Sequence, residues 1–217
     1  MKEEVINGIA YCLDEDNLTA EVIQDEEIHE GDIIIPETIV FDGKTYRVTS
    51  IGKGAFSYCG SLTSIVIPEG VESIGSSAFE YCEKLTSITI PSSVTSIGVN
   101  TFYCCFSLTS IVIPDNATSI GDGAFAGCRS LTSITIPSNV TSIGNYAFFA
   151  CDRLNAIIIP DSVTSIGDSA FARCVSLFLF IFKGTIAQWK EIELGDNWNN
   201  EVFPTKLVHC IDGDVRG

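Results

Sequence analysis

Residues 62–84 read LTSIVIPEGVESIGSSAFEYCEK, and this stretch recurs along the chain with little change at its apolar positions. Its phenylalanine returns every 23 residues, at Phe56, Phe79, Phe102, Phe125, Phe148 and Phe171. A cysteine column from Cys59 to Cys174 and a leucine column from Leu62 to Leu177 keep the same step. A fixed period of this size is typical of a solenoid, in which each repeat forms one coil and stacks on its neighbours.

Each coil contains one clear strand signal. Ser64–Ile67 is β-branched and alternates with period two, which predicts a strand with Ile65 and Ile67 pointing inward. Pro68 has no N–H to donate and should end this strand at the same height in every coil. Gly75 is expected to adopt a backbone angle that a β-carbon would forbid. The following apolar residues have the spacing of one helix face, so we predict a short helix over Ala78, Phe79, Cys82 and Leu85.

The two ends of the chain depart from the repeat, which predicts three parts. We expect an acidic N-terminal cap with a β-hairpin over residues 1–50, a solenoid over 51–182 and a C-terminal cap over 183–217. The hairpin is predicted at Val40–Tyr46, around an Asp42-Gly43 turn. In the last part we predict a short helix over Thr185–Glu193 that lays Ile186, Trp189 and Ile192 over the open end, and a final strand over Leu207–Ile211.

The charge of the chain excludes several classes of partner. It carries 28 acidic and 12 basic residues, a net charge of −16, which disfavours nucleic acid and anionic membrane surfaces. Residues 1–50 hold 13 acids and 3 bases, so the acidity is concentrated at the start, around Asp14–Asp16 and Asp25–Glu27. This segment is interpreted either as a solubilising surface or as a docking surface for a basic partner. No apolar run is long enough to span a membrane, and we expect no membrane insertion.

The nine cysteines are interpreted as thiols rather than as a disulfide framework. Six of them form one repeat column, whose side chains should point the same way into the core and pack as small hydrophobes. Adjacent coils could bring two of these sulfurs within bonding distance, but parallel side chains fit disulfide geometry poorly. Cys12, Cys104 and Cys210 lie outside the column.

No catalytic, metal-binding or cofactor-binding motif is recognisable. The two histidines, His29 and His209, lie one at each end of the chain, and neither belongs to a cluster with metal-ligand spacing. Asn116-Ala-Thr118 and Asn139-Val-Thr141 match glycosylation sequons, although the repeat consensus would create them by itself. We therefore expect no enzyme activity, no metal and no cofactor.

The pattern Leu-x-x-Ile-x-Ile-Pro-x-x-Val-x-x-Ile-Gly-x-x-Ala-Phe-x-x-Cys closely resembles the BspA-like, or treponemal-type, leucine-rich repeat. The match covers about residues 50–182, with small departures such as Thr101 before Phe102 and Ala117 in place of valine. The resemblance implies an α/β repeat solenoid, a right-handed leucine-rich repeat with parallel strands and short helices, capped at both ends. It also implies a bacterial or protozoan protein, often displayed on the cell surface and associated with adhesion to host proteins or to other cells.

These observations predict a non-enzymatic protein-protein interaction or adhesion module that binds a host or cell-surface protein through one solenoid face. The expected location is the cell surface or the extracellular space. Met1-Lys2-Glu3-Glu4 shows no secretion signal, so a cytoplasmic, protein-binding scaffold is the alternative, which the thiols also favour. A carbohydrate- or cell-wall-binding module is a further alternative. Neither the partner nor the oligomeric state follows from the sequence.

Two surfaces are candidates for binding. The outward strand positions should form a flat, uncharged and partly apolar face, made of Ser64, Val66, Ser87, Thr89, Ser110, Val112, Ser133, Thr135, Ala156 and Ile158. Aromatic residues that vary between repeats could form a patch on the opposite side, at Tyr81, Tyr103, Phe106, Tyr146 and Phe149. The alternatives are an ordinary solvated sheet face and aromatic rings that lean back onto neighbouring coils.

Overall fold

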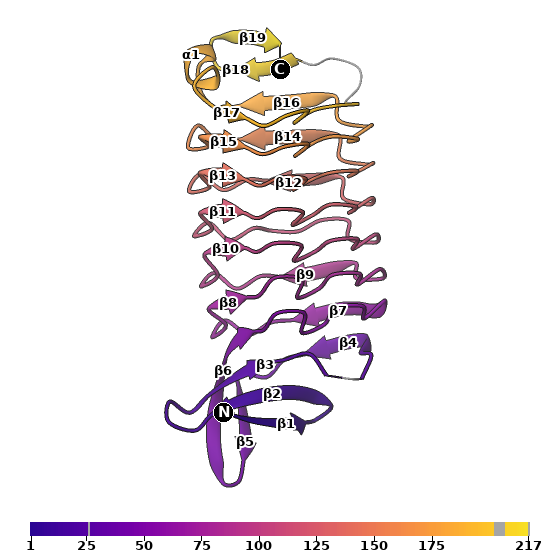
Figure 1. Ribbon diagram of the computed structural model, residues 1–217, viewed down its shortest axis with the longest axis vertical. Coiled ribbons are helices and arrows are strands. Elements are labelled where there is room, and N and C mark those ends of the chain that lie inside the picture. Colours follow the sequence, from indigo (N-terminus) through magenta and orange to yellow (C-terminus); the bar gives the residue numbers. More distant parts are fainter. Residues whose placement is uncertain (26, 202–206, 217) are drawn as a thin grey trace.

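The computed structural model describes residues 1–25, 27–201 and 207–216. Glu26, in the acidic run of the N-terminal segment, and part of the predicted C-terminal cap therefore lie outside the described residues. Figure 1 shows an elongated stack of coils, with the first strands at one end and the single helix and last strands at the other.

The N-terminal segment is built of strands that lead into the stack. They are β1 (Lys2–Ile6), β2 (Ile9–Asp14), β3 (Thr19–Val22), β4 (Glu30–Ile34), β5 (Thr38–Phe41) and β6 (Lys44–Ile51). β1, β2 and β3 are antiparallel neighbours, β3 pairs parallel with β6, and β5 pairs antiparallel with β6. The hairpin of β5 and β6 turns at Asp42 and Gly43, whose φ angles of 48° and 72° are those of a tight type I′ turn.

Most coils contribute one longer strand, and these strands stack in parallel along one side. They are β7 (Ser61–Val66), β9 (Ser87–Thr89), β12 (Ser133–Thr135), β14 (Ala156–Ile159), β16 (Leu179–Phe182) and β18 (Leu207–Cys210), followed by the antiparallel β19 (Gly213–Arg216). β4 pairs parallel with β7 at the start of this series, and Val112 joins Thr89 through an isolated bridge. Inward-facing isoleucines are buried, as predicted, with Ile65 2% and Ile67 4% exposed.

A second series of two-residue strands runs along another side of the coils (Figure 1). It contains β8 (Ser73–Ile74), β10 (Ser96–Ile97), β11 (Ser119–Ile120), β13 (Ser142–Ile143), β15 (Ser165–Ile166) and β17 (Glu193–Leu194). β8 pairs with β6, and the other five strands of this series form one parallel sheet in the order β10, β11, β13, β15 and β17. Both series keep the register of the repeat, since Ser119 pairs with Ser142 and Ser64 with Ser87.

The predicted short helix in each coil is wrong, because residues 75–84 form successive turns. Two residues of this segment, Ser77 and Tyr81, have positive φ angles of 58° and 57°, which a right-handed helix does not allow. The backbone N–H of Phe79 donates to the carbonyl of Thr101 in the next coil at 2.9 Å. The backbone therefore bonds between coils, where a helix would have bonded within one, and the repeats of the described chain are strand and turn without helix.

The described residues contain one helix, α1 (Ile186–Trp189), which is shorter than the predicted Thr185–Glu193. Thr185 and Gln188 form a reciprocal capping box that begins the helix. Glu193 instead belongs to β17 and pairs with Ser165, so the last part of the predicted helix is a strand. Trp189 and Ile192 are buried, as expected from their apolar spacing, whereas Ile186 is only partly buried.

The core is a continuous column of stacked rings. The six repeat phenylalanines are fully buried, and neighbouring rings lie 5.2–5.6 Å apart between centroids with interplanar angles of 2–11°. Other rings meet the ends of the column, because His29 lies 5.2 Å from Phe56, while Phe180 and Trp198 lie 5.3 Å and 6.3 Å from Phe171. Each inner ring thus contributes burial to two interfaces between coils.

The glycine that follows the short strand is needed for close approach, and the predicted unusual φ angle is wrong. Gly75 does not have a positive φ, but a β-carbon there would lie 2.6 Å from the backbone nitrogen of Lys53. A β-carbon at Gly144 would lie 2.6 Å from the backbone nitrogen of Asp122 and 2.7 Å from the carbonyl carbon of Gly121. The glycine column therefore sets how closely the coils can stack.

Replacing a ring in the middle of the column should destabilise the whole stack. We expect Phe125→Ala to lower the free energy of unfolding by about 3–5 kcal/mol, because it removes a fully buried ring and leaves a cavity. Denaturant melts followed by circular dichroism measure this, with the exposed Thr135→Ala as the control. A loss below about 1 kcal/mol would show that the ring column is not the core.

Adding one methyl group to the glycine column should also be costly. Gly144→Ala is expected to lose about 1–3 kcal/mol, because the new atom meets backbone that cannot move aside without shifting a coil. Gly60→Ala is the matched control, since its added atom would lie 3.8 Å from the nearest neighbour, the carbonyl oxygen of Tyr81. Equal melting midpoints for the two variants would contradict this role of the column.

Candidate functional site

The predicted strand-face residues lie together on one side of the stack. Parallel pairing aligns Ser64 with Ser87 and Val66 with Thr89. The bridge from Thr89 to Val112 and the pairing of Thr135 with Ile158 continue the outer column. Exposure along this column is high at the valines, 50% at Val66 and 78% at Val112. Of the predicted set, Ser64, Ala156 and Ile158 are half-buried, while Ser87, Thr89, Ser110, Ser133 and Thr135 are exposed.

The structure extends this face beyond the predicted residues. Ile34 on β4 pairs with Val66 and is 74% exposed, and Ile181 on β16 pairs with Ile158. The column ends at His209, which pairs with Ile181 and contacts Asp214 at 2.8 Å. The sequence Ile33-Ile34-Ile35-Pro36 carried the signal for Ile34, because it repeats the Ile-x-Ile-Pro pattern of the coils.

Asp32 closes the serine column at its N-terminal end. Its Oδ1 accepts hydrogen bonds from the hydroxyls of Ser64 at 2.6 Å and Thr63 at 2.7 Å. These bonds, with Ser64 first, lower the pKa of the Asp32 carboxyl. The outer face therefore has its charged groups at the two ends and hydroxyl and aliphatic groups between them.

The aromatic residues do not form one patch. Tyr103 contacts Tyr81 edge to face at 5.4 Å, and Tyr81 stacks on Tyr58 at 5.0 Å. Phe149 belongs to a separate group, in which it contacts Tyr146 at 5.7 Å. The buried Ala126 lies between Tyr103 and Phe149 in their shared column, so the two groups stay apart.

Arginine side chains lie over two of the predicted aromatic rings, Phe106 and Phe149. The guanidinium of Arg129 lies 4.9 Å from the centre of the Phe106 ring, and that of Arg173 lies 5.5 Å from the centre of Phe149. Phe106 and Phe149 are thus partly covered by neighbouring coils, as the alternative interpretation of this patch expected. The prediction from variation between repeats did not include Tyr58, although this residue is 62% exposed. Tyr58 follows Phe56 by two residues, as Tyr81 follows Phe79, and this shared position could have identified it.

The tyrosine ladder is a poor platform for sugar rings. Tyr58 and Tyr81 stack with an interplanar angle of 13°, so each ring covers a face of the other. Carbohydrate stacking needs an open aromatic face, because the contact is made by the π surface. This stacking covers one face of each of the two rings, which gives the carbohydrate alternative little support from this surface.

The column cysteines are free, buried thiols, as the sequence predicts. The sulfurs of the five column cysteines from Cys82 onward also donate to the phenylalanine carbonyl of the preceding coil, for example Cys82 to Phe56 at 3.1 Å and Cys174 to Phe148 at 3.0 Å. Burial raises the pKa of the thiols of Cys59, Cys82, Cys105, Cys128 and Cys151. Thiolate is the reactive form, so these residues are placed for packing rather than for chemistry.

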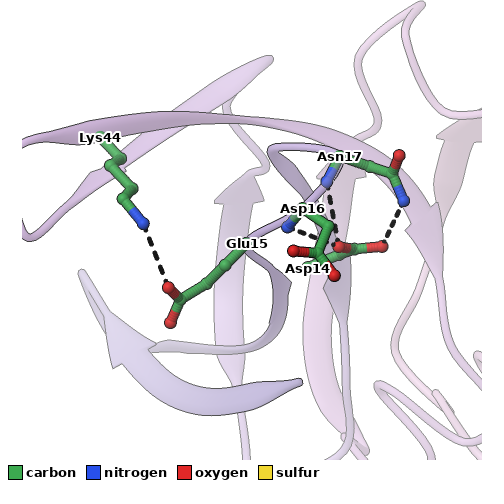
Figure 2. Close-up of polar contacts among 5 residues, drawn as sticks. All are labelled: Asp14, Glu15, Asp16, Asn17 and Lys44. Atoms are coloured by element: carbon green, nitrogen blue, oxygen red, sulfur yellow. Dashed lines mark hydrogen bonds and ion pairs between the residues drawn. The ribbon is translucent and has the colours of Figure 1, made fainter.

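The acidic turn near the N-terminus is internally hydrogen-bonded (Figure 2). The carboxylate of Asp14 accepts from the backbone N–H groups of Asp16 and Asn17 and from the Asn17 side chain at 2.8 Å. The Asn17 side chain is the main cause that lowers the pKa of Asp14. Lys44 reaches across to Glu15 at 3.1 Å, an exposed ion pair of small energetic weight.

Both sequons use their asparagine side chains in contacts between coils. The amide nitrogen of Asn116 donates to the carbonyl of Ser92 at 2.9 Å, and that of Asn139 donates to Asp115 at 2.8 Å. A glycan on either nitrogen would replace these hydrogen bonds. The two motifs therefore have a structural role in the ladder.

The described ranges, 1–25, 27–201 and 207–216, contain no group of three or more His, Cys, Asp or Glu side chains that could hold a metal ion. In the same part of the chain, no helix has the length and apolar character needed to cross a bilayer.

Stacked coils with parallel strands, a ring column and hydroxyl-lined outer faces define a repeat protein of the leucine-rich class. The chain belongs to the BspA-type leucine-rich repeat family, whose repeat region matches six copies over residues 49–178. Leucine-rich repeat families are generally protein-protein interaction modules, and no catalytic family is indicated.

Solved structures of bacterial leucine-rich repeat proteins are similar to this chain. A leucine-rich repeat protein from Bacteroides ovatus is 35% identical with a TM-score of 0.76, over 92% of this chain and 54% of that one. The leucine-rich repeat protein of T. pallidum is 28% identical with a TM-score of 0.75, over 89% and 86%. The chain therefore spans about half the length of the Bacteroides ovatus protein. No curated protein matches it.

Thiol accessibility can be tested by alkylation of the folded protein. Iodoacetamide at mildly alkaline pH should modify Cys12, Cys104 and Cys210, which are partly exposed, and leave the six column cysteines unmodified. Peptide mass spectrometry before and after denaturation measures both sets. Modification of Cys128 as fast as Cys12 in the native protein would contradict the burial of the column.

Proposed function

We propose that this chain is a non-enzymatic adhesion module that binds a host or cell-surface protein through its outer strand face. The observation that supports this most is the exposed β-branched column, in which Ile34, Val66 and Val112 are 74%, 50% and 78% exposed. Exposed aliphatic side chains that recur along one face, here with threonines between some of them, favour an interaction site, because monomers seldom leave large apolar patches uncovered.

The composition of the face suits a protein better than a charged ligand. Between Asp32 and His209 the two outward columns contain serine, threonine, alanine, valine, leucine and isoleucine. Protein interfaces combine an uncharged, well-packed centre with a polar rim, and a sheet face presents the centre without moving. The family's typical association with bacterial surfaces supports display outside the cell. We further propose that residues 1–50 and 183–217 act as the caps of the solenoid over 51–182.

An intracellular protein-binding scaffold is the second candidate. The nine cysteines of the chain are free, and free thiols are typical of reducing compartments. This function would use the same face, so the two candidates differ in the partner rather than in the binding surface.

The binding face can be tested with charge-bearing variants. We expect Val66→Lys with Val112→Lys to abolish capture of a partner from solubilised host-surface and matrix proteins, because both side chains would enter the apolar column. Ser73→Lys with Ser96→Lys places the same charge on exposed positions of the short-strand series and should leave capture unchanged. Bacterial cytosol serves as the parallel input, and the bound fraction is quantified by mass spectrometry.

Variants of the aromatic residues test whether the aromatic side, rather than the strand face, is the binding surface. If Tyr103→Ala with Phe149→Ala abolishes capture while the valine variant keeps it, the binding surface is the aromatic side and the strand-face proposal is wrong. Capture from the cytosol alone, lost in the valine variant, would support the scaffold.

A further inference from the structure

The outer face has a repeat of its own, twice as long as the coil. Three coils end their strand with an aliphatic residue, a proline and an acid, in Val66 to Glu69, Val112 to Asp115 and Ile158 to Asp161. The coils between them carry threonine and serine at the equivalent positions, Thr89 with Ser92 and Thr135 with Ser138. The five coils from Val66 to Asp161 therefore alternate an apolar-acidic coil with a hydroxyl coil. The alternation ends on both sides of them, because Ile34 pairs with Val66 and Ile181 pairs with Ile158.

Stacking turns this alternation into a regular spacing. Neighbouring strands lie about 4.8 Å apart, so equivalent side chains in alternate coils lie roughly 9.6 Å apart. Glu69, Asp115 and Asp161 are exposed at the corner where each coil turns after its proline. Arg47, which lines the same shallow hollow as Glu37 and Glu69, is a cation beside the first acid. Val66 and Ile158 are four coils apart, roughly 19 Å.

This spacing selects among the regular conformations of a bound segment. A polyproline II helix rises about 3.1 Å per residue and places every third residue on one side, which gives about 9.3 Å. An α-helix repeats a face after seven residues at about 10.5 Å, so it would drift by roughly 2 Å between Val66 and Ile158. An extended strand repeats a face at about 6.6 Å, which fits neither one coil nor two.

We propose that the outer face binds a polyproline II segment of its protein partner, one that carries a lysine or arginine at every third residue. The cations face Glu69, Asp115 and Asp161, and the proline rings pack on Val66, Val112 and Ile158. This inference rests on the proposed strand-face binding and adds the chemistry of the partner.

The hydroxyl coils complete the match. A polyproline II backbone makes no internal hydrogen bonds, so its carbonyl groups need donors from the surface that it covers. Thr89 and Thr135 are exposed between the aliphatic residues and offer hydroxyl donors at the intermediate rungs. The face thus offers apolar contact, cation binding and carbonyl binding in one repeating order.

The experiment uses two labelled peptides of identical composition. One contains four Pro-Pro-Lys triplets, and its isomer has the same lysines clustered at one end. Fluorescence anisotropy with the full chain should show at least about tenfold tighter binding of the periodic peptide. Raising the salt to about 0.5 M should weaken this binding, since exposed ion pairs are screened. Equal affinity for the two peptides would overturn the proposed register.

The variants use residues that the protein already has at equivalent positions. Val112→Thr with Asp115→Ser converts an apolar-acidic coil into a hydroxyl coil and should weaken the periodic peptide about tenfold. Glu72→Thr with Val99→Ser is the matched control, because it removes one acid and one exposed valine on another face, with residues found in neighbouring coils. Affinity in the control should stay within about twofold of the parent chain.

The outcomes separate this inference from the proposed function. If neither peptide binds, or if control and test variants lose affinity equally, the polyproline II partner is wrong, whether or not the valine-to-lysine variant abolishes protein capture. If that variant leaves capture intact and the periodic peptide still binds, the proposed partner contact is wrong while the peptide site stands.

Discussion

Backbone hydrogen bonding from each coil to the next is the constraint on which this structure depends. Paired strand residues are offset by 23 residues, and in the turn segment each donor bonds to a carbonyl 22 residues further along, as Phe102 does to Ala124 and Phe125 to Ala147 at 2.8 Å. A coil of different length would place every following side chain in the wrong column. The ring, thiol and glycine columns follow from this offset, because each needs its neighbours at the same height.

The same offset builds the outer surface. The residue type at one position, such as valine or threonine between the two isoleucines of a strand, is repeated at intervals along a face rather than scattered over the molecule. Surface chemistry can therefore acquire a period of its own without cost to the core, since inward and outward positions alternate along each strand. Leucine-rich repeats suit binding for this reason.

Side chains from outside the 23-residue repeat contact the rings at both ends of the phenylalanine column. His29 and Trp198 lie against the first and last rings of the phenylalanine column, and each is 27 residues from its neighbour in that column. Neither position could be found from the 23-residue pattern, because the connecting segments add residues to the period. Ring-to-ring contact in the folded chain, rather than spacing, selects these two side chains.

The sequence by itself determined the coil length, the inward strand residues, the buried thiols and the family, because all of these follow from one period and from side-chain character. The prediction from sequence failed where the same apolar spacing fits both a helix and a series of turns. The order Ala78, Phe79, Cys82 and Leu85 suits a helix, but the positive φ angles at Ser77 and Tyr81 and the bonds between coils make it a series of turns. Tertiary structure also decided that Gly75 is needed for close packing and that Tyr103 and Phe149 lie in separate groups. Those outcomes depend on contacts between neighbouring coils, which residue spacing within one coil does not contain.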